Sequence, residues 1–378
     1  MTPLAIPFID LKSQYQDHKT ALDAAVQNVL NHGQYVMGPE VAELEEKLSS
    51  YIDTKHALAC SSGTDALLLA LMAKGVQQGD AIFTSPFTFF ASAESISLAG
   101  ATPVFVDIDP DTYNLDAQDL QEKINKILKD NELNPKGIMP VDLFGLAADY
   151  DAIQVIAEDN NLFILEDAAQ SFGAPYKGKK AGALAEIAAT SFYPAKPLGG
   201  YGDSGAVFTS NSKLYEKLIS LRVHGQATSG DKYDNIQIGL NGRMDSIQAA
   251  VLLEKLKIYD EELERRTEVA QRYTKRLSDA CKTPIIALEQ GSVWAQYTIE
   301  VDNRERLKAN LSEKGIPSNV FYPIPIHLST AYEFMEHTIG DFPVAEKAAK
   351  HVISLPMHPY LETDSIDFIC DTVLDSIA

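Results

Sequence analysis

The sequence predicts an α/β fold in which a mostly parallel β-sheet is flanked by helices on both faces. Two observations lead to this prediction. From about residue 56 to residue 193, short apolar runs alternate with segments of helical spacing, and this alternation is typical of parallel strands joined by crossover helices. A long helical stretch and a tail of mixed elements follow, which predicts a smaller α+β part at the C-terminal end.

Each element is predicted from its own pattern. Polar and apolar residues recur at helical spacing over residues 15–31 and 39–51, so two helices are expected before the sheet. Short apolar runs give seven strand candidates, at residues 56–60, 81–85, 103–106, 137–141, 162–166, 187–193 and 205–209. Further along, the pattern predicts a long helical stretch at 241–280, a strand at 294–301 and a helix at 304–314. We therefore expect a large domain over residues 1–250 and a small domain over residues 251–378.

Composition disfavours several classes of function. The chain has 378 residues and a formal net charge of −21, which disfavours nucleic acid and anionic membrane surfaces as partners because both are negatively charged. Its three cysteines show no pairing pattern, and its eight histidines show no metal-ligand spacing. The first ten residues lack a basic stretch, and no segment approaches the roughly 18 apolar residues of a spanning helix. We therefore expect a cytoplasmic protein without a metal.

Lys196 is the first candidate for chemistry. It follows the strand candidate 187–193 and precedes the glycine-rich turn Gly199-Gly200-Tyr201-Gly202. A lysine held half out of water at the end of a sheet has a lowered pKa, and its unprotonated amine can attack a carbonyl carbon. Taken alone, the position fits an ordinary solvated lysine better, so the surrounding motifs decide.

Two further segments complete a recognisable pattern. An apolar run ends in Glu166 and Asp167, which is how a buried parallel strand carries an acid to the ligand-binding edge of a sheet. The segment Ser62-Gly63-Thr64 is expected to form a turn between a strand and a helix, and free amides at such a turn bind anions. A lysine, a buried aspartate and a phosphate-binding turn together predict a pyridoxal 5'-phosphate site.

These motifs, taken together, resemble those of the DegT/DnrJ/EryC1/StrS family of sugar-nucleotide aminotransferases over nearly the whole chain. The resemblance implies the fold type I architecture of pyridoxal-phosphate-dependent transferases, a homodimer with shared active sites, and L-glutamate as amino donor. The segments that carry it, besides the Lys196 segment, are Gly38-Pro39-Glu40, Ser62-Gly63-Thr64-Asp65-Ala66-Leu67, Glu166-Asp167-Ala168-Ala169-Gln170, Gly239-Leu240-Asn241-Gly242-Arg243-Met244-Asp245 and Phe321-Tyr322-Pro323-Ile324-Pro325.

The resemblance implies a role for each residue around the cofactor phosphate. Gly63 and Thr64 would hold the phosphate with the help of Ser191, and Asn241 would reach it from the neighbouring subunit. Each also has an ordinary interpretation. The first two fit any strand-to-helix turn, and Asn241 fits a loop residue or a helix cap.

Three more residues are expected around the cofactor ring. By resemblance, Asp167 pairs with the pyridine nitrogen, Gln170 lies near the phenolic oxygen and Phe89 stacks on the ring. The ordinary interpretations are a helix cap for Asp167 and core packing for Phe89. The neighbours Phe87 and Phe90 are expected in the core.

Three residues are expected on the substrate side of the site. A guanidinium binds a carboxylate in bidentate fashion, so Arg243 is the first choice for the carboxylate of a uronate, although it could form a surface ion pair. Tyr322 and His327 match the substrate-side loop of the family. Their ordinary interpretations are a core tyrosine and a surface histidine.

Within the family, the closest resemblance is to UDP-2-acetamido-2-deoxy-3-oxo-glucuronate aminotransferases, which supply precursors of surface polysaccharides such as the lipopolysaccharide O-antigen. This narrower interpretation depends on residues 191–203, on Val293-Trp294-Ala295-Gln296-Tyr297-Thr298 and on Tyr322-Pro323-Ile324-Pro325. Two alternatives stay open. One is a 4-keto-6-deoxy nucleotide-sugar aminotransferase, and the other is a non-catalytic regulatory protein that binds the cofactor.

Overall fold

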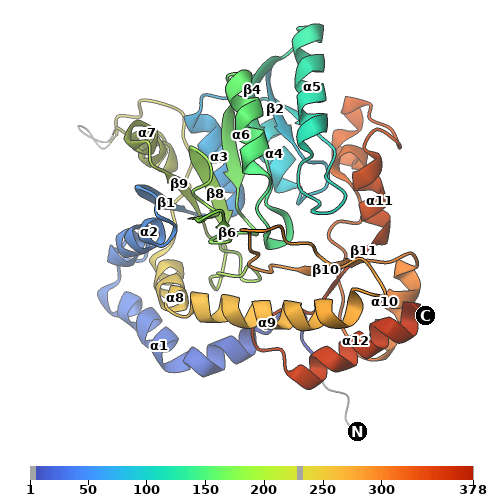
Figure 1. Cartoon of the computed structure of the whole chain (residues 1–378). Coiled ribbons are helices and arrows are strands. Elements are labelled where there is room, and N and C mark those ends of the chain that lie inside the picture. Colours follow the sequence, from blue (N-terminus) through green and yellow to red (C-terminus); the bar gives the residue numbers. More distant parts are fainter. Residues whose placement is uncertain (1–5, 228–232, 378) are drawn as a thin grey trace.

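A seven-stranded sheet forms the centre of the protein (Figure 1). The structure is a computed structural model and describes residues 6–227 and 233–377. The strand order is β1-β9-β8-β5-β4-β2-β3; β9 runs antiparallel to both β1 and β8, and the other neighbours are parallel. The expected mostly parallel sheet is confirmed. Its strands are β1 (His56–Cys60), β2 (Asp80–Thr84), β3 (Thr102–Phe105), β4 (Asn134–Met139), β5 (Phe163–Asp167), β8 (Ile187–Ser191) and β9 (Gly205–Thr209).

Alternating side chains of the strands pack on opposite faces of the sheet. In β1, Leu58 and Cys60 face a core formed with α3, α4 and α7, whereas Ala57 and Ala59 face a core formed with α2 and α8. The period of two is that of a strand buried on both sides. A third core lies under α5 and α6. The helices are α2 (Pro39–Ile52), α3 (Gly63–Ala73), α4 (Ala91–Leu98), α5 (Ala117–Asp130), α6 (Tyr150–Asp159), α7 (Ser212–Arg222) and α8 (Ser246–Leu256).

The C-terminal part has a separate core around a two-stranded antiparallel sheet. There β10 (Tyr297–Glu300) pairs with β11 (Val352–Leu355), and the helices α9 (Tyr259–Leu277), α10 (Arg304–Glu313) and α12 (Thr363–Ile377) pack around it. The predicted strand at 294–301 and helix at 304–314 are therefore confirmed. The remaining elements are α1 (Leu11–His32), α11 (Pro343–His351), the hairpin β6 (Pro175–Tyr176) and β7 (Lys179–Lys180), and the 3₁₀ turns Leu143–Gly145, Ile326–Leu328 and Thr330–Met335.

The long helical stretch expected at 241–280 is two helices, not one. α8 ends at Leu256 and α9 begins at Tyr259. Neither glycine nor proline marks the break, and the helical spacing of apolar residues continues across it. The break was therefore not predicted. The expected domain boundary at residue 250 also falls inside α8, whose Ala249 and Leu252 belong to the core of the large sheet. We propose to place the division after α8.

Several strands end at the same edge of the sheet and so bring distant segments together. β1, β8 and β5 are mutually parallel in direction, because β9 reverses between β1 and β8. Their carboxyl ends lead to the α3 turn, to the Lys196 turn and to Asp167. Ligands of open α/β sheets bind at this edge. In the ranges that the structure describes, none of the helices has both the length and the apolar character needed to cross a membrane.

Candidate active site

The turn between β1 and α3 presents two backbone amides without partners. Ser62 caps the helix, since its Oγ accepts a 3.0 Å hydrogen bond from the amide of Asp65. The amides of Gly63 and Thr64 take part in none of the hydrogen bonds found within the described residues. A Cβ on Gly63 would lie 2.6 Å from Cβ of Ser191, so only glycine lets this turn pack against the end of β8. The amides, the helix dipole and the Ser191 hydroxyl form a cradle for an anion.

Asp167 ends β5 as a buried carboxylate that points toward this edge. It is 3% exposed, and its Oδ2 accepts a 2.9 Å hydrogen bond from Oγ of Ser92. The amide of Ala169 donates to Oδ1 at 3.2 Å. Burial raises the pKa of Asp167, while the bonds from Ser92 and Ala169 and the charge of Lys196 oppose this rise. A buried acid of this kind is stabilised by a cation, such as a protonated ring nitrogen.

Glu166, the other acid of the pair, serves a structural purpose. Its two carboxylate oxygens accept hydrogen bonds from the backbone amides of Gly182 and Leu184, the latter at 2.8 Å. The side chain is fully buried. Of the two neighbouring acids, only Asp167 is therefore available to a ligand.

Lys196 lies close enough to Asp167 for each charge to influence the other. The turn that carries it is closed by a 2.8 Å hydrogen bond from the Lys196 amide to the Tyr193 carbonyl. Burial lowers the pKa of the Lys196 amine, and Asp167 partly restores it. Its Nζ forms no hydrogen bond or ion pair with any residue that the structure describes. A half-buried amine without a partner is suited to covalent attack on a carbonyl.

Phe89, Gln170 and Tyr322 form the third side of the site. Phe89 is 58% exposed, which is unusual for a large aromatic side chain and leaves its ring face open to a ligand. The Phe89 and Tyr322 ring centroids are 6.3 Å apart. Gln170 is buried and connects two segments. Its Nε2 donates to Oη of Tyr322 at 3.1 Å, and its Oε1 accepts from the Phe144 amide at 2.9 Å. As expected, Phe87 is in the core and Phe90 packs on it.

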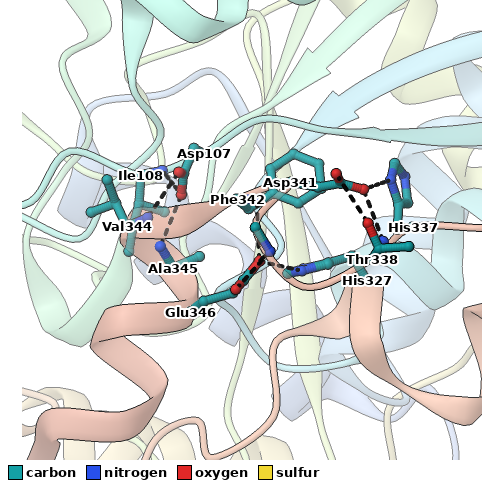
Figure 2. A network of polar contacts seen from close by, with 11 residues as sticks. Asp107, Ile108, His327, His337, Thr338, Asp341, Phe342, Val344, Ala345 and Glu346 are labelled. Carbon is teal, nitrogen blue, oxygen red and sulfur yellow. Dashed lines mark hydrogen bonds and ion pairs between the residues drawn. The ribbon is translucent and has the colours of Figure 1, made fainter.

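His327, which was expected to bind the substrate, is part of a buried polar network with Glu346 (Figure 2). The residue is 1% exposed, and its ring is enclosed by protein. Nε2 lies 3.3 Å from Oε1 of Glu346, and the ring packs on Phe342 with centroids 4.6 Å apart. The expectation is corrected accordingly. Through Glu346, His327 attaches the segment that follows Tyr322 to the first half of α11. A sequence motif cannot reveal this contact, because a motif gives the type of a residue and not its burial.

The start of α11 is in turn fixed to the large sheet by Asp107 (Figure 2). The Asp107 carboxylate accepts hydrogen bonds from the amides of Val344 at 3.0 Å and Ala345 at 2.9 Å. An acid at this position satisfies free first-turn amides and complements the helix dipole. Asp107, α11 and His327 therefore connect the sheet to the Tyr322 segment.

Asn241 and Arg243 flank Gly242, whose carbonyl accepts a 3.1 Å hydrogen bond from the Ser61 amide next to the β1–α3 turn. Both Nε and Nη2 of Arg243 donate to Oδ1 of Asn241, at 2.9 Å and 2.7 Å. No hydrogen bond found within the described ranges connects either side chain to Lys196 or Asp167 of the same chain. The predicted pair is thus held together, at a solvent-facing position that a second subunit could approach.

The groups at this edge fit pyridoxal phosphate. The cradle at Gly63 would be filled by a Cβ, the buried Asp167 faces a cation-binding position, and the Lys196 amine is free. Ser92 is part of the arrangement but was not predicted. A serine inside a helical segment has no distinctive pattern, and its contact with Asp167 spans 75 residues of sequence.

Comparisons with known proteins agree with this arrangement. A sequence model described as the DegT/DnrJ/EryC1/StrS aminotransferase family matches residues 16–374. The UDP-2-acetamido-2-deoxy-3-oxo-D-glucuronate aminotransferase of Pseudomonas aeruginosa is 47% identical over 366 residues, which cover 97% of this chain and 98% of that protein. A crystal structure of a DegT DnrJ EryC1 StrS aminotransferase from Brucella abortus has a TM-score of 0.96 and 47% identity, covering 99% of this chain and 100% of that one. A putative sugar aminotransferase from Streptococcus pneumoniae in its PLP form has a TM-score of 0.88 and 28% identity, covering 94% and 96%.

Proposed function

Because the chain belongs to the DegT/DnrJ/EryC1/StrS aminotransferase family and is a pyridoxal-phosphate-dependent sugar aminotransferase, we propose that its acceptor is UDP-2-acetamido-2-deoxy-3-oxo-D-glucuronate. The amino donor is L-glutamate, and the product is the 3-amino sugar nucleotide, a precursor of surface polysaccharide such as lipopolysaccharide O-antigen. One observation carries the choice of sugar: the relative with that named activity is 47% identical over 98% of its length.

In this proposal, different residues at the sheet edge bind different parts of the cofactor. Bound pyridoxal phosphate supplies an aldehyde for the amine and a protonated ring that withdraws electrons from the reacting carbon. Gly63, Thr64 and Ser191 would bind the phosphate. Asp167 would keep the ring nitrogen protonated, and the exposed Phe89 would cover a face of the ring.

Lys196 would then act as the acid and base of the reaction. Its amine would bind the aldehyde at rest and, once released, would move a proton between the donor carbon and the former aldehyde carbon of the cofactor. Because burial lowers the pKa of this amine, a larger fraction is unprotonated at neutral pH than for a solvated lysine. Gln170 would contact the phenolic oxygen, and Tyr322, which it bonds at 3.1 Å, would face the substrate.

The uronate carboxylate would be bound by Arg243. The chain carries a net charge of −21, so an acceptor with a diphosphate and a carboxylate needs local cations to offset repulsion and lost hydration. The Arg243 guanidinium presents Nε and Nη2 together toward one acceptor, Oδ1 of Asn241. The same edge of the guanidinium can bind a carboxylate in bidentate fashion.

We place Asn241 and Arg243 in the active site of a partner subunit, so that a homodimer shares its sites. The surface around them supports this. Large apolar side chains of Val36 and Ile238 are exposed nearby, and Val36 forms a β-bridge with Asp245. Exposed apolar surface beside polar groups is typical of a protein interface. The described cysteines are free thiols, which supports our placement of the enzyme in the reducing cytoplasm.

A product assay tests the proposed function. The purified protein with pyridoxal phosphate and L-glutamate is given the 3-oxo uronate or a matched 4-oxo-6-deoxy UDP sugar, and products are identified by mass. We expect the amino uronate to form at a much higher kcat/KM. Preferential conversion of the 4-oxo sugar would replace the proposed acceptor, and no conversion of glutamate to 2-oxoglutarate with either sugar would favour a non-catalytic role.

A further inference from the structure

Lys255 is a buried lysine of α8 that forms no ion pair with any described residue. It is 2% exposed, and it belongs to none of the ion pairs within 4.0 Å that the structure contains over its described ranges. Its Nζ donates a 2.7 Å hydrogen bond to the carbonyl of Gly199. Burying an amine without a carboxylate costs free energy that methionine or leucine would not cost. Packing alone therefore does not explain a lysine at this position.

The carbonyl that Lys255 holds belongs to the turn that carries Lys196. Gly199 follows Lys196 by three residues, and a Cβ on Gly199 would lie 2.5 Å from the carbonyl oxygen of Pro194. The turn is therefore folded tightly on itself and accepts only glycine here. A 2.8 Å hydrogen bond from the Gly200 amide to the Phe192 carbonyl closes it. A compact turn of this kind moves as a unit, so its position depends on what holds Gly199.

The same face of α8 makes a second contact with the turn. Oε1 of Gln248, seven residues or two helical turns before Lys255, accepts a 2.8 Å hydrogen bond from the Tyr201 amide. The Tyr201 ring lies over the lysine, with Nζ 4.4 Å from the ring centroid, which is within cation–π range. α8 thus binds the turn at Gly199 and at Tyr201, on the side that leads away from Lys196.

We propose that Lys255 is a positioning residue, whose hydrogen bond to Gly199 fixes the turn so that the Lys196 amine stays at the cofactor edge beside Asp167. This inference rests on the proposed role of Lys196. The position of the Lys196 amine matters because a displacement of a reacting group by about 1 Å can lower a catalytic rate by about 100-fold. Burial lowers the pKa of Lys255 to about 8, and Glu262 opposes this shift. An amine donates a hydrogen bond in either protonation state.

The test compares Lys255→Met with Lys257→Met in the full-length holoenzyme. Met keeps most of the apolar stem of Lys255 but cannot donate to Gly199. Lys257, just after the end of α8, is solvent-facing and pairs with Glu254 at 2.7 Å, so its variant controls for loss of a lysine charge. Three quantities are measured: amide hydrogen exchange at Gly200 and Tyr201, and the rate and the apparent KM of the single-turnover reaction with L-glutamate.

We expect Lys255→Met to speed exchange at Gly200 and Tyr201 and to lower the single-turnover rate by about 10- to 100-fold. Exchange in α3 and β5 and the apparent KM should stay near wild type, and Lys257→Met should resemble wild type throughout. If Lys255→Met does not fold, the same measurements are made on Lys255→Gln, whose shorter neutral amide also leaves Gly199 unbound.

Two results would overturn the inference. One is a folded Lys255 variant with wild-type exchange and rate. The other is faster exchange over all of α8 and the sheet, with a rate lowered only in proportion to the unfolded fraction, because this pattern shows a merely structural lysine. A wild-type protein that fails to convert glutamate would count against the proposed function, and exchange at Gly200 would still decide the role of Lys255.

Discussion

Ser92 donates a 2.9 Å hydrogen bond to Asp167, joining the first turn of α4 to the end of β5. Both side chains are buried. Burial raises the pKa of the carboxyl, and the hydroxyl donor lowers it again by stabilising the charged form. Since the Ala169 amide donates to the other carboxylate oxygen at 3.2 Å, the two hydrogen bonds fix the orientation of the carboxyl group. The pair therefore presents an oriented carboxyl group to the position proposed for the cofactor ring nitrogen.

Asp167→Asn should cost much more in rate than in folding. The change is nearly isosteric, but an amide cannot keep the ring nitrogen protonated. Loss of a buried charge-assisted pair costs about 2–5 kcal/mol, which corresponds to a decrease in kcat/KM of roughly thirty-fold or more. Turnover and urea unfolding of the same preparation check this. Near-normal turnover would show that Asp167 only caps the following segment.

The neighbouring acid should respond in the opposite way. Glu166→Gln replaces one acceptor oxygen with an NH2 group, so one of the two backbone amides, those of Gly182 and Leu184, loses its acceptor. We expect the free energy of unfolding to fall by about 1–3 kcal/mol, with turnover per folded molecule little changed. Equal losses of rate in the Glu166 and Asp167 variants would remove the distinction between them.

Two inactive variants should restore activity when their subunits are mixed. Lys196→Ala and Arg243→Ala each remove one part of the site, and a heterodimer of the two keeps one intact site if the parts come from different subunits. We expect up to about a quarter of wild-type activity after exchange of equal amounts, because half the dimers are mixed and each of these has one of two sites. Exchange itself is followed by a mass tag. Proven exchange without activity would mean that each subunit has a complete site.

Arg243→Ala should discriminate between acceptors. The expected loss in kcat/KM is roughly thirty-fold or more with the uronate, as for a buried charge pair broken on one side, and smaller with a matched sugar nucleotide that lacks the carboxylate. Arg306→Ala, an exposed arginine of α10, is the control. The glutamate half-reaction is measured separately because Arg243 could also bind a donor carboxylate. An equal penalty with both sugars would exclude Arg243 as the group that recognises the uronate.

His358 should make the protein sensitive to mild acid. It is 2% exposed, and neither ring nitrogen makes a hydrogen bond of good geometry with any residue in the described ranges. Burial, together with the charge of Arg266, lowers its pKa to about 4 from an ordinary 6.5, although Asp10 opposes this. The unfolded chain therefore binds the proton first, and stability falls as pH decreases from about 6.5 to about 4.

The loss should reach about 3 kcal/mol in that window. It is measured as the difference in urea unfolding free energy between wild type and His358→Gln at several pH values. The wild type should lose more stability than the variant between pH 6.5 and 4. Parallel curves for the two proteins would show that His358 contributes nothing to acid sensitivity.

The sequence predicted those features that depend on local pattern. All seven strands of the main sheet were predicted within a few residues, because buried strands are short apolar runs between turns, and Lys196, Asp167 and Gly63 follow such runs directly. The break between α8 and α9 was missed, since helical spacing continues across it. Ser92 and Lys255 were missed because their partners, Asp167 and Gly199, are 75 and 56 residues away in sequence. Family likeness placed His327 with the substrate, but only packing shows that it is buried.

Mapping the lysine that binds pyridoxal phosphate is the most direct test of Lys196 as the active-site lysine. The loaded protein is reduced with borohydride, digested, and the modified peptide is sequenced by mass spectrometry. Burial lowers the pKa of two lysines near the carboxyl edge of the sheet, Lys196 and Lys255. The measurement shows which of these two amines binds the cofactor. We predict that the cofactor is attached to Lys196, and that Lys196→Ala retains some cofactor without covalent attachment and has no turnover. Attachment to Lys255, or to any other lysine, would contradict the account.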